Sequence, residues 1–168
     1  MSIVVNEICP PFSTWYGYCG AAAAIIFANL GSAYGTVTSG MGVCSIGPSH
    51  PNMVMKGIVP TIMAGILCIY GLIVAIIINS SITKEYTYFQ GFAHLSAGLM
   101  AGLSALCAGI AIGVVGEAGV RSYAREPKLF VGMLLILIFG EALALYGLIV
   151  GLIVGTKTPQ NGCDFVRV

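Results

Sequence analysis

A single carboxyl group lies inside the last long apolar run of this 168-residue chain. Glu141 is the only charged residue between Lys128 and Lys157. At about 1.5 Å per helical residue, each flank spans roughly 20 Å, so the carboxyl falls near the middle of a membrane span. A charged carboxyl at that depth costs about 2.5–3.5 kcal/mol on insertion scales, and such residues mark ion and proton pathways. Glu141 is therefore the candidate ion-carrying residue.

The composition is that of a membrane protein. Hydrophobic residues make up 58% of the chain, charged residues make up 8%, and the mean hydropathy is +0.97. Ordinary soluble domains carry about 25% charged residues. The net charge of +1 provides no basic patch for nucleic acid, which is not expected as a partner. The length predicts one membrane domain over residues 1–168.

Four uncharged runs divide the sequence, and each is long enough for a spanning helix of about 20 residues. They predict helices at about 13–42, 54–80, 88–122 and 127–156. Four spans place both termini on the same side of the membrane. The basic residues from Arg121 to Lys128 favour a cytoplasmic position for the loops 43–56 and 117–128, and hence luminal or exterior termini.

The two halves of the chain resemble each other. Residues 69–74 (IYGLIV) and 145–150 (LYGLIV) match at an offset of 76 positions, which places Gly65 opposite Glu141. The chain is therefore interpreted as two fused helical hairpins in parallel repeat. The first hairpin covers 13–80, and the second, which carries the carboxyl, covers 88–156.

The first and third predicted helices carry small residues along one face, which allows helix backbones to approach closely. Packing inside a four-helix bundle is the simple interpretation. Two whole faces of small residues nevertheless favour a ring, in which these helices crowd together on the small-radius side. The second and fourth helices would form an outer, lipid-facing layer that contains Glu141. The candidate ring-packing residues are Gly31, Gly35, Gly98, Gly102, Gly109 and Gly113.

The cysteines indicate no metal site, because the six of them lack metal-binding spacing, and no metal or other cofactor is expected. A disulfide between Cys9 and Cys163, in the two tails, is an open alternative to free thiols. Asn79 begins a glycosylation sequon, but a sequon beside a membrane span is expected to stay unmodified.

Four segments of the chain resemble the proteolipid, or c, subunit of the vacuolar-type proton-translocating ATPase. The last of them, KLFVGMLLILIFGEALALYGLIVGLI, carries the family's ion-carrying glutamate at Glu141, and Gly65 matches the family's position without a carboxyl. The resemblance implies an all-α membrane protein of four transmembrane helices. It also implies a ring built from copies of the chain and related proteolipids. The matching segments are residues 21–43, 56–74, 108–121 and 128–153.

The resemblance further implies a mechanism. The ring turns against a stationary membrane subunit that bears an arginine, and ATP hydrolysis in other subunits drives it, so the chain alone is no enzyme. Central-stalk subunits would contact the loops 43–56 and 117–128. Glu141 would be protonated in lipid, because desolvation disfavours the carboxylate, and would lose its proton near the arginine at one of two half-channels. The expected location is the vacuole or another acidic endomembrane compartment, with both termini luminal.

Two tyrosines are candidate hydrogen-bond donors to the carboxyl. Tyr70 and Tyr146 occupy equivalent positions in the two hairpins. A tyrosine hydroxyl near mid-membrane needs a partner, and the carboxyl is one available acceptor. Packing between helices, with a locally satisfied hydroxyl, is the preferred interpretation for both.

Three other functions are compatible with apolar helices. A passive pore needs a polar face, and the first and third helices offer few polar groups, such as Ser32 and Ser96. A structural scaffold leaves Glu141 unexplained. A sodium-driven ring needs about five or six oxygen ligands. The stretch 64–68 offers no side-chain oxygen, and Thr61 lies about a turn further along.

Overall fold

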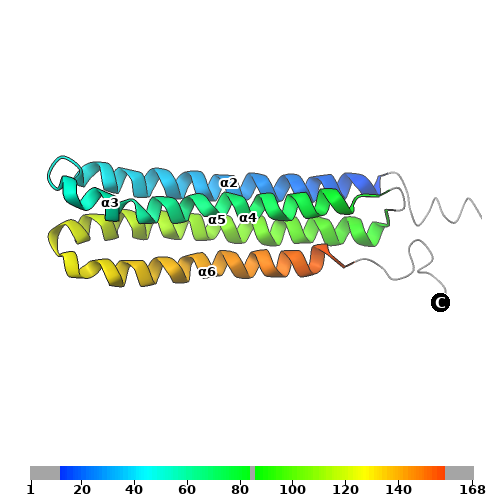
Figure 1. The fold of residues 1–168 in the computed structure, drawn as a ribbon. Helices are drawn as coiled ribbons and strands as arrows, with labels where there is room; N and C mark the ends of the chain where they lie inside the picture. Colours follow the sequence, from blue (N-terminus) through cyan, green and yellow to red (C-terminus); the bar gives the residue numbers. More distant parts are fainter. Residues whose placement is uncertain (1–11, 84–85, 158–168) are drawn as a thin grey trace, which may run out of the picture.

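The computed structural model describes residues 12–83 and 86–157, where all regular structure is helical. Four long helices lie side by side in one elongated bundle, each antiparallel to the one before it in the chain (Figure 1). They are α2 (Ser13–Ile46), α4 (Val59–Ser81), α5 (Tyr88–Arg125) and α6 (Phe130–Gly155). The short elements are η1 (Pro51–Met53) and α3 (Val54–Gly57) before α4, and η2 (Pro127–Leu129) before α6.

Local sequence explains where the helices begin and end. Proline occupies the first turn of η1, α4 and η2, where its missing N–H is not needed. A capping box starts α5: the Gln90 N–H donates to Thr87 Oγ1 at 3.3 Å, and the Thr87 N–H donates to Gln90 Oε1 at 3.2 Å. The first helix continues past the expected residue 42 to Ile46, because the first proline after its start is Pro48, which disfavours helical backbone at Gly47.

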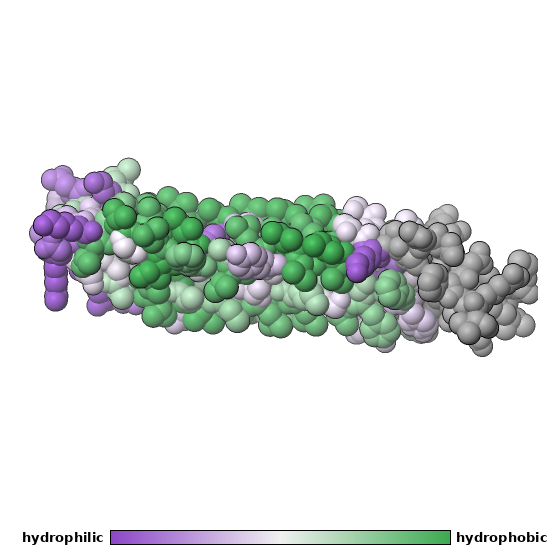
Figure 2. All heavy atoms as spheres, turned by 90° about the horizontal axis from the view of Figure 1, so that it is seen from below, coloured by the Kyte–Doolittle hydropathy of each residue, from purple (hydrophilic) through white to green (hydrophobic). Residues whose placement is uncertain are grey.

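The distribution of charge along the bundle is that of a multi-pass membrane protein. All four long helical segments are long and apolar enough to cross a membrane, which confirms the expected fold class. The sides of the bundle are apolar, and hydrophilic side chains gather at the end that carries the α2–α4 and α5–α6 connections (Figure 2). Both ends of the described chain lie at the opposite end. The charged residues near the connections are Lys56, Glu117, Arg121, Arg125, Glu126 and Lys128.

Helices α2 and α5 are in backbone contact through their glycines. A Cβ atom at Gly31 would lie 2.5 Å from the Cα of Leu106, and one at Gly35 would lie 2.7 Å from the carbonyl oxygen of Gly109. No side chain fits at such distances. The first and third helices are therefore in contact inside one chain, which is the bundle packing given above as the simple interpretation, whereas the expected crowding of these helices in a ring stays a prediction. The glycines at this interface include Gly31, Gly35, Gly98, Gly102, Gly109 and Gly113.

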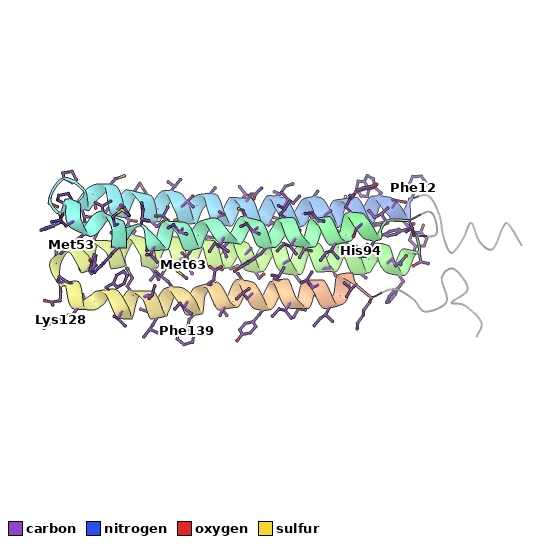
Figure 3. The ribbon with its side chains drawn as sticks, viewed as in Figure 1. Phe12, Met53, Met63, His94, Lys128 and Phe139 are labelled. Atoms are coloured by element: carbon purple, nitrogen blue, oxygen red, sulfur yellow. The ribbon has the colours of Figure 1, made fainter. Side chains whose placement is uncertain are left out.

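A buried histidine fastens the helices at the end opposite the connections (Figure 3). The Nε2 atom of His94 lies 3.0 Å from the Gly155 carbonyl oxygen, which can only accept, so Nε2 carries the proton. Nδ1 then accepts from the Tyr86 hydroxyl at 2.5 Å. Burial raises the pKa of Tyr86 to about 12, so this hydroxyl keeps its proton. The Ser13 hydroxyl of α2 donates to the Tyr86 carbonyl at 2.8 Å. These hydrogen bonds therefore link α2 as well as α5 and α6.

We expect Gly109→Ala to destabilise the folded chain, because a Cβ atom at this position would collide with the backbone of Gly31. Overpacking costs about 1–3 kcal/mol, and a helix backbone cannot move aside as a flexible side chain can. Gly40→Ala is the matched control, since a Cβ there meets nothing within 4 Å. Thermal unfolding in detergent should show a lower midpoint than that of the native chain for Gly109→Ala but not for Gly40→Ala. Equal midpoints for the two variants would contradict this account of the α2–α5 contact.

Candidate functional site

Glu141 lies on the buried face of α6, and only 9% of the residue is exposed. Leu137 and Ala144, one turn away on either side, share this face and are fully buried. Both belong to the same core cluster as Leu67 of α4 and Ile112 of α5. The carboxyl is therefore held among apolar side chains where α6 meets α4 and α5.

The expectation that this carboxyl faces lipid is wrong. Phe139 and Leu143, its neighbours on α6, are exposed and form the outward surface of the helix, and Figure 3 shows Phe139 pointing away from the bundle. Helix α6 does present large apolar side chains to the outside, as expected for an outer layer. The helical period nevertheless turns Glu141 inward, on the same side as Leu137 and Leu148.

A single hydrogen bond holds the carboxyl. The Tyr70 hydroxyl of α4 donates to Oε1 of Glu141 at 2.7 Å, while Oε2 is buried without a hydrogen-bond partner among the described residues. The ion pair found in the described part of the chain joins Arg121 to Glu117 at 2.6 Å, outside the apolar part of the bundle. A carboxylate here would be a buried charge without a counter-charge, which is costly, whereas the neutral acid avoids this cost.

The structure distinguishes the two candidate tyrosines. Tyr70 contacts the carboxyl, so packing alone does not describe its role. Tyr146 is 64% exposed and makes no hydrogen bond to Glu141 within the described chain. The two residues occupy equivalent repeat positions, so their difference reflects their neighbours rather than their local sequence.

Side-chain oxygens for a cation are scarce at this site. Thr61, the nearest hydroxyl expected from the sequence, accepts a hydrogen bond of 3.1 Å from Ser39 of α2. Gly65, the repeat counterpart of Glu141, contributes no side chain. In residues 12–83 and 86–157 no group of three or more His, Cys, Asp or Glu could hold a metal ion. The local chemistry therefore consists of one carboxyl and one tyrosine hydroxyl.

Other sequence expectations have separate outcomes. Cys9 and Cys163 lie outside the described residues, so their pairing stays untested. Asn79 is exposed near the end of α4, and its modification is likewise untested. His94 had no role among the sequence predictions, although a lone histidine in an apolar run, close to a span end, is a signal that could have identified it. The free cysteines among the described residues are Cys19, Cys44, Cys68 and Cys107.

The fold and the site define a membrane protein of two fused helical hairpins with one intramembrane carboxyl. The family of the ATP synthase C subunit matches residues 19–78 and again residues 95–154, one match for each hairpin. The chain belongs to this family, among the proteolipid subunits of V-type proton ATPases.

The relatives match over nearly their whole length. The V-type proton ATPase 16 kDa proteolipid subunit of Chrysotila carterae is 57% identical over 159 residues, which covers 91% of this chain and 97% of the relative. The corresponding 16 kDa proteolipid of the V-type proton ATPase of Rattus norvegicus is 53% identical over 148 residues, covering 88% and 96%. The c subunit of the V-type proton ATPase of Candida tropicalis is 47% identical over 157 residues, covering 94% and 98%.

We expect Tyr70→Phe to increase the rate at which a lipid-soluble carbodiimide labels Glu141. The substitution removes the only hydrogen bond to the carboxyl within the described chain, and the carboxyl can then turn more readily toward the helix surface where the reagent arrives. A hydrogen bond of this kind contributes about 0.5–1.5 kcal/mol, so the increase should reach up to roughly tenfold. Tyr146→Phe is the matched control and should label at the native rate. Identical rates for all three proteins would show that Tyr70 does not restrain the carboxyl.

Proposed function

We propose that this chain is the proton-carrying ring subunit of a rotary V-type ATPase, and that Glu141 carries the proton. The observation that supports this proposal most directly is the carboxyl itself, buried near mid-span, with one hydrogen bond and no counter-charge among the described residues. A structural scaffold has no use for such a group. The proton ATPase named for the relatives requires a group of this kind, because transported protons need a titratable carrier in the membrane.

Transport follows from alternating environments. Inside the bundle the neutral acid is favoured, because its apolar neighbours do not stabilise a charge. At the interface with a stationary membrane subunit, an arginine within about 4–6 Å of Glu141 favours ionisation, and the proton leaves through one half-channel. Release requires the carboxyl to turn away from Tyr70 toward that subunit. Rotation then carries the carboxylate to a second half-channel, where it is reloaded.

The proposed partners follow from the same assignment. Copies of this chain and related proteolipids form the ring, and lipid covers its outer surface. The loops 43–56 and 117–128 meet central-stalk subunits in the cytoplasm, consistent with the basic residues at that end. Other subunits hydrolyse ATP, so this chain has no catalytic residue of its own. Both termini are luminal, in the vacuole or another acidic endomembrane compartment.

A passive pore is less well supported than a ring subunit. The glycines of α2 and α5 bring the two backbones into contact, which leaves no room for a water path between these helices. The apolar core cluster fills the space between α4, α5 and α6. Neither region of the chain offers the polar, water-lining face that a solute channel needs.

We expect Glu141→Gln to abolish ATP-driven acidification while leaving the chain folded and the ring assembled. The amide is nearly isosteric, and its oxygen can still accept from Tyr70, but it cannot release a proton. Glu141→Asp should retain partial activity, since the carboxyl remains but sits one methylene further from α4. Proton uptake by membrane vesicles measures activity, and native gels measure assembly. Substantial uptake by the glutamine variant would remove the basis of the proposal.

We expect pumping to proceed unchanged in sodium-free buffer. A sodium site needs about five or six oxygen ligands. Here Glu141 has the Tyr70 hydroxyl beside it, and Thr61 is bonded to Ser39. Sodium added at constant pH and ionic strength should therefore not protect Glu141 from carbodiimide. Labelling that declines in proportion to added sodium would assign the transported ion to sodium instead.

A further inference from the structure

A buried histidine lies near the end of the bundle where the described chain begins and ends, and the proposed transport of protons does not use it (Figure 3). Only 1% of His94 is exposed, and only 3% of Tyr86, its neighbour in the α4–α5 connection, is exposed. Histidine is the side chain whose charge ordinarily changes between about pH 5 and about pH 8. His94 is therefore a candidate for a group that responds to protons.

The two nitrogens of the His94 imidazole have different hydrogen-bond partners, and the present bonds require a neutral imidazole. Nε2 donates to the carbonyl oxygen of Gly155, the last residue of α6, at 3.0 Å. Nδ1 accepts from the Tyr86 hydroxyl at 2.5 Å. Protonation of Nδ1 would place a second donor against this hydroxyl, so the hydroxyl proton would have to find another acceptor.

The Tyr86 hydroxyl has little room to turn away. A Cβ atom at Gly17 of α2 would lie 2.5 Å from the hydroxyl oxygen and 3.4 Å from Cδ1 of Ile82, so both groups lie close against the α2 backbone. Among the described residues the hydroxyl has no second hydrogen-bond partner. A protonated His94 therefore cannot keep its contact with Tyr86 without leaving a donor unsatisfied, which is costly in a buried place.

The groups around His94 and Tyr86 are uncharged where the structure describes them. The Ser13 hydroxyl of α2 donates to the Tyr86 carbonyl, and a Cβ atom at Gly20 would meet the His94 carbonyl, so α2 faces this pair with a hydroxyl and with backbone. Lys157, just past the end of α6, is exposed and would repel a cation. The charged residues of the α4–α5 connection, Lys84 and Glu85, lie outside the described residues.

The carboxyl groups of the described residues lie far from this histidine. Glu117 and Glu126 are near the connections at the opposite end of the bundle. Glu141 precedes Gly155 on α6 by about 14 residues, which is roughly 21 Å along a helix. A charged His94 would therefore be a buried cation without a counter-charge in the described part of the chain, which is strongly unfavourable unless water reaches it.

We propose that His94, Tyr86 and Gly155 form a latch that protons from the lumen open. Protonation of His94 breaks its bond with Tyr86, and hydration of the charged imidazole separates the end of α6 and the α4–α5 connection from α5. The inference goes beyond the proposed function and takes from it only that this end of the bundle is luminal. The latch links the acidity of the compartment to the helix that carries Glu141.

The direction of the response follows from proton linkage. The closed latch holds a neutral His94, whereas the open latch leaves the imidazole in water, where it binds one more proton. Acid therefore favours the open latch. Because an exposed histidine titrates near about pH 6.5, the ratio of open to closed latch should rise up to about thirtyfold between about pH 7.5 and about pH 5.

A purely structural histidine is the competing explanation. Such a residue would fasten α5 to α6 equally at every pH. A glutamine at this position offers the same two bonds, since its amide donates to Gly155 and accepts from Tyr86 but cannot take up a proton. The two explanations therefore differ in pH dependence and in the behaviour of His94→Gln.

Nitrogen NMR of isotope-labelled histidine, with the assembled protein in lipid, tests the latch directly. The chain has two histidines, so His50→Gln leaves His94 as the source of the signal. At about pH 7.5 we expect a neutral imidazole with its proton on Nε2, close to the Gly155 carbonyl carbon, and at about pH 5 a doubly protonated imidazole that has lost this contact. Glu85→Gln should give the same result, which excludes the neighbouring carboxyl as the cause. An imidazole that stays neutral at about pH 5, or that is doubly protonated while the contact persists, overturns the inference.

Thermal unfolding provides a second test. The midpoint of the native chain should fall more on acidification than that of His94→Gln, because only the native chain gains a proton at this position. His50→Gln is the matched control and should follow the native chain, since His50 is exposed at the opposite end of the bundle. An equal fall for the native chain and His94→Gln would contradict the latch. If the glutamine variant does not fold, the NMR measurement on native His94 still decides.

The outcomes separate this inference from the proposed function, because neither measurement involves pumping. If His94 does not titrate, the latch is overturned and the proposed function stands. If the latch opens in acid while Glu141→Gln still acidifies vesicles, the proposed function is overturned, and the latch remains without its luminal assignment.

Discussion

The hydrogen bond from Tyr70 to Glu141 is the interaction on which the rest of this structure depends for its function. It fixes one oxygen of a buried carboxyl and leaves the other without a partner among the described residues. A carboxyl whose two oxygens both had hydrogen-bond partners would be a structural group, and it would exchange its proton less readily. One with no partner would carry the full cost of desolvation. A single donor on a neighbouring helix gives a restrained but releasable acid, provided that α4 and α6 stay adjacent.

The glycines of α2 and α5 provide that adjacency. Their backbone contact keeps the centre of the bundle narrow, so α4, which packs on α2 and α5, reaches α6, which packs on α5. At the end opposite the connections, His94 and Tyr86 join α5 to α6 and to the loop before α5. These groups lie far from Glu141 in sequence, and the contact of His94 with Gly155 joins the end of α6 to α5.

The sequence was sufficient for the spans and the repeat, because both depend on hydropathy and spacing alone. It was insufficient for the direction of the carboxyl. Helix α6 is apolar on every side, so no amphipathic pattern tells which face is buried, and the lipid-facing expectation was wrong. The same limit applied to the tyrosines: Tyr70 and Tyr146 have nearly identical local sequences, and only tertiary packing assigns one of them to the carboxyl.

Only one of the two hairpins carries a carboxyl, and on the proposed function this affects the free energy available for each transported proton. On the proposed function, each copy contributes two hairpins to the ring but one carboxyl, at Glu141 rather than at Gly65. A ring of a given number of hairpins then carries half as many protons per turn as one with a carboxyl in each. Because the ATP hydrolysed per turn is set by other subunits, each proton receives about twice the free energy. At about 1.4 kcal/mol for each tenfold ratio, the loss of one carboxyl per pair favours a steeper proton gradient over a larger proton flux.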